Sequence, residues 1–458
     1  MRPQHQVRAM LAALLLAGIG CQGTSLAARD QTPDIVGFRF VPHVMRHDRT
    51  EPVVFEARVR GNPTRVVLEC DGTELQMSDD GTGGDRVADD NVHAIALQAR
   101  RITSKLGPDD VFRPFVGYCK LYDGANEALR INVFAEVFTG AIPLVSVERI
   151  GRHAQASAHL VNLVGKVRPE RFRARSWAQK FYRICRDDYD FLNFMPLPAV
   201  RGNRYHFQVK NAAKGLGMRR FDNTREYGSD GRLLGITLFP ISYFFDGASK
   251  AYQHELAHQW INFLHDTAFE SGIPHWPLSD VACGMIGFSI GGGGGEGGDF
   301  PFQLVPEGDN FRLASISREE MSVFNDLELY LMGLLPADQV EPHFVFDNQD
   351  QTPLPNALFS GPVTRVTIED IVARVGPRDP DVQLSQKRFR VATIVVSDQL
   401  LTTEEMSFYD FFSRRAELRE RVPYRSGFAK GIANPFRLST GGRGELDTRI
   451  GETRRPSP

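Results

Sequence analysis

The chain has 458 residues, of which 42% are hydrophobic and 24% are charged, and its formal net charge at pH 7 is −2. This length exceeds what one compact core usually accommodates, so two or three domains are expected. The near-neutral charge creates no overall positive field that would attract nucleic acid, and the sequence has no basic stripe, so we expect no nucleic-acid partner.

The N-terminus has the pattern of an export signal. Arg2 and Arg8 precede an apolar run over residues 9–19, and this run is too short to span a bilayer. The small residues Ser25 and Ala27 suit cleavage by a signal peptidase. Alternatively, Cys21 would accept a lipid anchor if the segment is processed as in lipoproteins. The pattern predicts a signal peptide over residues 1–28. The protein is expected to be periplasmic, an outer-membrane lipoprotein or extracellular.

Four cysteines remain beyond this segment. Export implies an oxidising compartment, in which an even number of cysteines favours disulfide bonds. Cys70 and Cys119 both lie in strand-like segments, so we expect them to pair. Cys185 and Cys283 are then expected to pair by elimination.

Residues 33–138 contain short runs of β-branched and aromatic residues, which turn residues separate at regular intervals. This spacing is typical of a β-sandwich, which we assign to residues 29–145. Within it, the segment SDDGTGGDRVADDNVH resembles a loop of bacterial immunoglobulin-like domains, including those called choice-of-anchor modules. The resemblance implies an immunoglobulin-like module that would position or anchor the rest of the chain.

The aspartates of this loop form a candidate calcium (Ca²⁺) site, because hard cations prefer several oxygen ligands. The candidates are Asp79, Asp80, Asp85, Asp89 and Asp90. The alternative is that aspartate and glycine turns simply connect two strands.

From about residue 149 helical and strand-like segments alternate, which predicts an α+β domain over residues 146–340. Helices are expected over residues 153–167, 174–185, 247–264 and 317–335, and strands over residues 189–195, 205–211 and 232–244.

A glycine tract at residues 291–298 lacks the spacing of a phosphate-binding loop. It is expected to be a flexible surface loop, with a lid over a cleft as the alternative. Residues 341–458 mix strand-like and helical segments and carry no catalytic constellation. They are expected to form a small mixed α/β region, with an extension of the preceding domain as the alternative.

The segment HELAH at residues 254–258 carries candidate chemistry. Residues four apart lie on one face of a helix, so His254 and His258 can bind one zinc ion (Zn²⁺). Glu255 lies beside them, where its carboxylate can take a proton from metal-bound water. Only 12 residues are histidine, and a chance match is expected in on the order of one chain in a hundred of this length. The segment therefore predicts a catalytic zinc site.

The longer segment HELAHQW resembles the zincin metallopeptidases. In leishmanolysin-like metzincins an inserted segment precedes a third histidine in an HW dipeptide, and a Met-turn follows. His275, Trp276 and Met285 occur in this order, and Glu328 would then hold the turn. The short metzincin pattern is absent, because Ile261 stands at its glycine position.

The gluzincin branch offers a different third ligand, a glutamate on a later helix. Glu328 is the candidate there, and Tyr330 would stabilise the oxyanion. His275, Trp276 and Met285 together match the metzincin branch. His275 is therefore favoured as third ligand, and Glu328 is the alternative. His265 and Asp266 are interpreted as polar residues that end the histidine helix.

The strand expected over residues 232–240 directly precedes the histidine helix. In zincins a strand at this place forms the rim of the cleft, where an extended peptide adds through main-chain hydrogen bonds. The alternative is an internal strand of the sheet.

The complete interpretation is a multidomain protein: an all-β immunoglobulin-like sandwich, an α+β zincin-like catalytic domain and a small mixed α/β C-terminal region. The resemblance implies an exported zinc metallopeptidase that hydrolyses protein or peptide substrates. Zinc would be bound by His254, His258 and His275, and Glu255 would act as general base and then general acid. The alternative is a surface-binding or adhesion protein whose zincin-like domain is inactive or only stabilised by metal.

Overall fold

The computed structural model describes residue 200 and the ranges 32–99, 112–168, 171–197, 202–240, 245–288, 300–351, 353–423 and 431–453. The predicted signal peptide, Cys21 and the glycine tract lie outside these residues. The described part is rich in β-strands, which form several sheets, and contains few helices. None of the helices described is long and apolar enough to cross a membrane.

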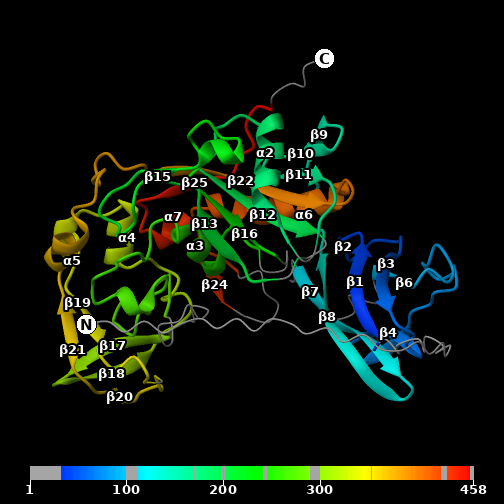
Figure 1. Cartoon of the computed structure of the whole chain (residues 1–458), viewed down its shortest axis with the longest axis horizontal. Coiled ribbons are helices and arrows are strands. Elements are labelled where there is room, and N and C mark those ends of the chain that lie inside the picture. Colours follow the sequence, from blue (N-terminus) through cyan, green and yellow to red (C-terminus); the bar gives the residue numbers. More distant parts are fainter. Residues whose placement is uncertain are drawn as a thin grey trace, which may run out of the picture.

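The first strands of the described chain form two sheets (blue to cyan, at the right of Figure 1). The first has the order β1 (Asp34–Val41), β3 (Val53–Arg60) and β6 (Val92–Leu97). The second has the order β2 (Val44–Arg46), β8 (Asn126–Phe138), β7 (Phe112–Asp123), β4 (Arg65–Cys70) and β5 (Thr73–Gln76). Side chains from both sheets form one buried cluster, which includes Phe55 and Leu68. The strands predicted over residues 33–138 are present, and they form two packed sheets.

An eight-stranded sheet lies at the centre of the molecule (Figure 1). Its order is β13 (Tyr205–Gln208), β16 (Gly235–Leu238), β12 (Phe191–Leu197), β22 (Arg388–Ser397), β11 (Val161–Val164), β10 (Ala154–Ala156) and β9 (Glu148–Gly151), with β25 (Glu445–Asp447) paired to β22. The four strands β16, β12, β22 and β11 are mutually parallel, and β13 is antiparallel at one edge.

The two middle strands are buried on both faces. Successive side chains of a strand point to opposite faces. Accordingly Phe191 and Val391 join one hydrophobic cluster, whereas Leu192 and Ala392 join another. Helix α2 (Ala174–Ile184) contributes to the second cluster. Continuous apolar runs such as those of β12 and β22 are typical of parallel strands that are covered on both sides.

The remaining elements surround this sheet. The further helices are α3 (Lys250–Ala257), α4 (Asp326–Met332), α5 (Ile368–Val375), α6 (Thr403–Arg414) and α7 (Phe436–Ser439). The small sheets are β14 (Lys210–Asn211) with β15 (Phe221–Asp222), β17 (Phe302–Glu307) with β18 (Asn310–Ser315) and β20 (Leu358–Phe359), β19 (His343–Phe346) with β21 (Val363–Val366), and β23 (Val422–Pro423) with β24 (Ile432–Ala433).

Two expectations about this region require correction. The expected boundary between residues 340 and 341 does not separate two units, because β22 lies between β12 and β11 in the central sheet. The C-terminal residues are thus an extension of the preceding region. The helix expected over residues 153–167 is also wrong, since this segment forms β10 and β11. Its apolar spacing suits a helix, but pairing of β11 with β22 outweighs that local preference.

Helix α6 packs against the second N-terminal sheet. The main-chain N–H of His43 donates to Glu405 Oε1 at 2.7 Å, and the rings of Phe138 and Phe408 have centroids 5.6 Å apart. Phe138 also belongs to the hydrophobic cluster that covers one face of the central sheet. The N-terminal sheets and the central sheet therefore share part of one core.

Neither expected disulfide is formed in the structure. Cys119 and Cys283 are free thiols, so Cys70–Cys119 and Cys185–Cys283 are not bonded. Cys119 lies opposite Leu68 on the neighbouring strand, two positions from Cys70. Burial raises the pKa of the Cys119 thiol to about 12 and that of Cys283 to about 11, which makes both poor nucleophiles.

Candidate metal centre

Helix α3 supplies the first two candidate ligands. The hydroxyl of Ser249 caps the helix by accepting the Tyr252 N–H at 3.1 Å. The helix ends at Ala257 with His258 as its C-cap, earlier than expected, and Trp260 and Ile261 beyond it are buried in the core. His265 and Asp266 consequently lie beyond the helix rather than at its end.

Three imidazoles converge at one point. His254, His258 and His275 each offer a ring nitrogen, and these atoms lie within 4.8 Å of one another. His254 Nε2 is 3.2 Å from His258 Nε2 and 3.3 Å from His275 Nε2. All three residues are buried. Tetrahedral zinc with bonds of about 2.0–2.1 Å places its nitrogens about 3.3 Å apart, so the cluster has the dimensions of a zinc site.

The outer ring nitrogens determine which tautomer two of these histidines adopt. His254 Nδ1 lies 3.1 Å from the Met285 carbonyl oxygen, and His258 Nδ1 lies 3.2 Å from that of Ile261. A carbonyl oxygen only accepts, so each Nδ1 carries the proton and each Nε2 offers a lone pair. Facing lone pairs at such distances repel unless a cation lies between them. The residues therefore fit a divalent metal.

The three imidazoles are also in the neutral form that metals require. Burial, reinforced by the neighbouring imidazoles, lowers the pKa of His254 well below its usual value and that of His258 to about 3. Burial and the charge of Arg204 lower the pKa of His275 to about 4. Neutral imidazoles bind a metal without first releasing a proton.

Asn262 fixes the position of His275, and its role was not recognised in the sequence. The Asn262 side-chain amide donates to the carbonyl oxygens of His275, at 2.9 Å, and Phe269, at 3.3 Å. The main-chain N–H of the neighbouring Trp276 donates to the Gly287 carbonyl at 3.0 Å. These contacts hold the loop of His275 beside the end of α3.

The structure does not bring Glu328 to the histidines. Its buried carboxylate accepts the Trp276 indole N–H at 2.9 Å and the main-chain N–H groups of Ile286 at 3.1 Å and Asn325 at 3.0 Å. The Met285 N–H lies 3.4 Å from the same carboxylate. Burial raises the pKa of Glu328, and these donors oppose the rise. Glu328 thus holds the segment around Met285, whose carbonyl contacts His254, and it is not placed as a third ligand.

Tyr330 is likewise placed away from the predicted oxyanion role. Its hydroxyl oxygen accepts the Arg378 main-chain N–H at 3.1 Å. The side chain is buried among residues of the main core. The gluzincin alternative therefore lacks Glu328 in the ligand group, and the hydroxyl of Tyr330 is already engaged by Arg378.

Glu255 lies beside the imidazoles and faces a cation that sequence reasoning missed. Arg204 Nε is 3.0 Å from Glu255 Oε1, and the arginine side chain is 37% exposed whereas that of Glu255 is 7% exposed. Burial raises the pKa of Glu255 to about 7, although Arg204 opposes this rise. No short motif could have indicated Arg204, because it is far from α3 in the sequence.

The strand predicted to form the rim is internal. β16 lies between β13 and β12, whereas β13 pairs only with β16 among the described strands. β13 starts one residue after Arg204, and the side chain of Gln208 donates to the carbonyl of His258. Within the described residues, the edge of the sheet nearest the histidines is therefore β13.

His343 joins the two segments that support the site. Its Nδ1 is 3.3 Å from Asp280, in the loop before Met285, and its Nε2 is 3.1 Å from Asp326 at the start of α4. Burial alone would lower its pKa, but the two carboxylates outweigh burial and raise the pKa of His343 to about 9. The imidazolium is thus an ionic link between the loop and α4.

We expect this link to make stability depend on pH. The pKa of His343 rises from 6.5 to about 9 on folding, so its stabilisation is full below pH 6.5 and is lost as the pH rises through 9. At 1.36 kcal/mol per unit, His343→Gln should lower the free energy of unfolding by about 3 kcal/mol at pH 6 and by much less above pH 9. Urea unfolding at both pH values checks this, with the exposed His153→Gln as control. Equal losses at the two pH values would contradict it.

Three of the five loop aspartates also come together. Asp79, Asp85 and Asp90 each place an oxygen within 4.8 Å of the others, whereas Asp80 and Asp89 are outside this group. Asp79 accepts the Asp90 N–H at 3.1 Å, and Asp85 accepts the N–H of Gly81 at 2.7 Å. Such contacts are those of turns that connect strands. Calcium binding stays a prediction.

Comparison of the chain with protein-family models, with curated proteins and with solved structures finds no match.

Proposed function

We propose that this chain is a zinc-dependent peptidase whose metal is held by His254, His258 and His275. The observation that carries the proposal is the convergence of three buried imidazoles, two of which are fixed with their lone pairs facing inward. Structural zinc sites usually have four protein ligands, whereas catalytic sites have three and keep one position open. Among the residues that the structure describes, three potential ligands are grouped at this site, which supports a catalytic role.

The chemistry assigns separate tasks to the surrounding residues. Zinc, when bound, would supply Lewis acidity that lowers the pKa of water and polarises a carbonyl group. Glu255 is the group that accepts the proton of the attacking water and then returns it to the leaving amine nitrogen. Its pKa of about 7 suits both transfers near neutral pH. Arg204 holds the Glu255 carboxylate and limits its motion.

The open edge of β13 supports a peptide as the substrate. An extended peptide can add to a free strand edge through main-chain hydrogen bonds, which depend little on side-chain sequence. β13 begins beside Arg204 and contacts the end of α3 through Gln208. A substrate strand along this edge would therefore pass close to Glu255.

The metal content of the purified chain tests the ligand set. We expect one zinc per chain, and we expect His275→Ala to weaken zinc binding by more than about 100-fold, since removing even a supporting residue typically costs 10–100-fold. His265→Ala is the matched control, because His265 lies nearby but its side chain is 57% exposed and outside the cluster. Equal zinc affinities for these two variants would contradict the assignment.

A hydrolysis assay separates the peptidase from the alternative. Chelator-sensitive cleavage of unfolded protein supports the peptidase. Stoichiometric zinc without cleavage of any unfolded protein would instead support a surface-binding or adhesion protein with a metal-stabilised but inactive domain.

We also propose export through the N-terminal segment, with the two N-terminal sheets acting as an immunoglobulin-like module. The two sheets with a shared core support this module. The mass of the mature N-terminus tests export: a lipid-modified Cys21 indicates an anchored protein, a start near residue 29 indicates a released one, and an intact N-terminus contradicts export.

A further inference from the structure

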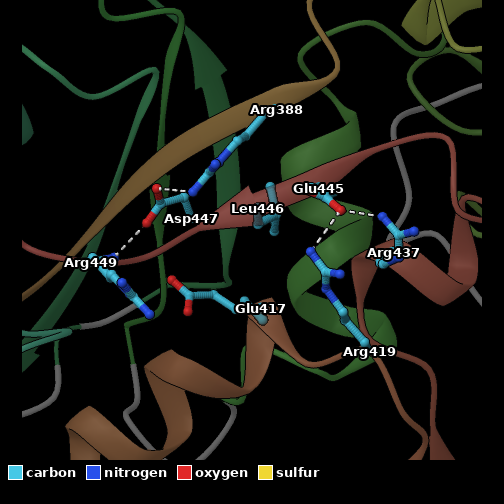
Figure 2. Close-up of a pocket in the computed structure, with 9 residues that line it drawn as sticks. Arg388, Glu417, Arg419, Arg437, Glu445, Leu446, Asp447 and Arg449 are labelled. Carbon is cyan, nitrogen blue, oxygen red and sulfur yellow. Dashed lines mark hydrogen bonds and ion pairs between the residues drawn. The ribbon is translucent and has the colours of Figure 1, made fainter.

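An arginine-rich hollow lies among the C-terminal elements, and nothing in the proposed peptidase chemistry uses it (Figure 2). It consists of a cavity of about 310 Å³ and an adjoining one of about 650 Å³. Glu417, Arg419 and Arg449 line both, so the two cavities are direct neighbours. We call the hollow the arginine basin, after its five arginines: Arg388, Arg414, Arg419, Arg437 and Arg449.

The arginine basin carries an excess of positive charge. Its carboxylates are Glu417, Glu445 and Asp447, so five guanidinium groups face three carboxylates and leave an excess of two positive charges. The whole chain has a net charge of −2. The basin is therefore positive on a slightly acidic protein, and such a concave site attracts anions.

Internal ion pairs engage only some of the arginines. Arg388 is 2.7 Å from Asp447, and Glu445 is shared between Arg419, at 3.2 Å, and Arg437. Figure 2 shows these pairs on the walls of the cavity. Three arginines thus share two carboxylates, and their remaining N–H groups are still available to a ligand.

Two guanidinium groups have no such partner. Within the described part of the chain, the side chains of Arg414 and Arg449 form no hydrogen bond or ion pair. Arg449 is fixed through its main chain, whose N–H donates to Asp447 at 3.1 Å. These two guanidinium groups account for the excess of two positive charges. Arg414 lies at the end of α6, and Arg449 lies just after β25.

A buried histidine completes the wall of the larger cavity. His159 is 8% exposed, and its Nδ1 lies 3.0 Å from the Thr448 hydroxyl, which in turn donates to Glu417 at 3.0 Å. Because that hydroxyl already donates its proton, it accepts from His159 Nδ1, and Nε2 offers a lone pair. The basin therefore presents many N–H donors together with acceptors that suit an acidic O–H group.

These features select the class of ligand. A carboxylate has two oxygens and is saturated by one or two arginines, whereas a phosphoryl group offers three or more oxygens and an ionisable O–H. Guanidinium groups from separate elements around one cavity suit the larger number of acceptors. We propose that the arginine basin binds a phosphoryl group, either as inorganic phosphate or as the phosphomonoester of a larger ligand.

The test is calorimetric titration of the full, zinc-loaded chain with inorganic phosphate at constant ionic strength. Arg449→Gln and Arg414→Gln are each expected to weaken binding about tenfold or more, since each removes a charge-assisted contact. Glu417→Gln is expected to strengthen binding, because it removes a negative charge but keeps an oxygen for Thr448. Arg60→Gln is the matched control, an exposed arginine outside the basin.

Two further probes identify the source of the phosphoryl group. Glycerol 3-phosphate represents soluble phosphomonoesters, and phosphatidylcholine vesicles with or without phosphatidic acid represent a lipid headgroup. Binding of either probe that is weakened by Arg449→Gln but not by Arg60→Gln supports the proposal and assigns the source. Absence of binding by all probes, or equal binding by these two variants, overturns it, while unchanged circular dichroism spectra show that the variants are folded.

Discussion

Replacement of Glu255 by Gln is expected to reduce peptide hydrolysis by about 10²- to 10⁴-fold and to leave zinc content unchanged. The amide keeps the size of the side chain but cannot accept the proton of the attacking water. The zinc-facing nitrogens belong to other residues, so the metal site should persist. Initial rates of cleavage of an unfolded protein substrate, measured beside metal analysis of the same preparation, check both parts.

The control for this variant is Glu270→Gln, which changes an exposed glutamate paired with His265 and should cleave at the rate of the unmodified chain. Hydrolysis that survives in the Glu255→Gln protein would remove Glu255 from the mechanism. A simultaneous loss of zinc would show instead that the residue supports the metal site.

The largest effect on stability is expected for Glu328→Ala. The carboxylate is fully buried and has four N–H groups within 3.4 Å, from Trp276, Met285, Ile286 and Asn325. Removing a buried charge from its partners typically costs 3–5 kcal/mol, and each donor left unsatisfied adds to the cost. We therefore expect the free energy of unfolding to fall by about 3–5 kcal/mol. Urea unfolding measures it.

The same variant should also weaken zinc binding by about 10–100-fold, because residues that orient ligands affect metal affinity by this amount. Glu328 acts through Trp276, next to His275, and through Met285, whose carbonyl contacts His254. Glu341→Ala is the control, because Glu341 is an exposed side chain near the start of α4 and should change stability by less than about 0.5 kcal/mol. Unchanged unfolding of Glu328→Ala would show that the carboxylate does not hold the turn.

The sequence indicated the candidate site because its pattern is local. The spacing of His254 and His258 follows directly from helix geometry, and the structure brings His275 to the same point. Arg204 and Asn262 were not foreseen, since each acts through contacts that only the folded chain creates. The sequence could also not decide the role of Glu328, because a buried carboxylate needs partners whether these are a metal or N–H groups.

The individual strands were easier to predict than their arrangement. β12 and β22 have the continuous apolar runs of buried strands; the first was expected over residues 189–195, and the second lies in the region expected to mix strands and helices. Their pairing joins residues near 190 to residues near 390, and nothing in either run specifies that partner. For the same reason the sequence could not show that β16 is internal and β13 is the edge. Register and order depend on contacts between distant segments.

The position of β22 in the middle of the central sheet has a consequence for synthesis. β11 and β12 are made early, but the strand that separates them is made near the end of translation. A chain stopped before residue 388 would lack the strand that pairs with both β11 and β12. The histidines of α3 and the loop of His275 would then pack against a central sheet that lacks β22. If the chain is a peptidase, a product that lacks β22 is therefore expected to be inactive.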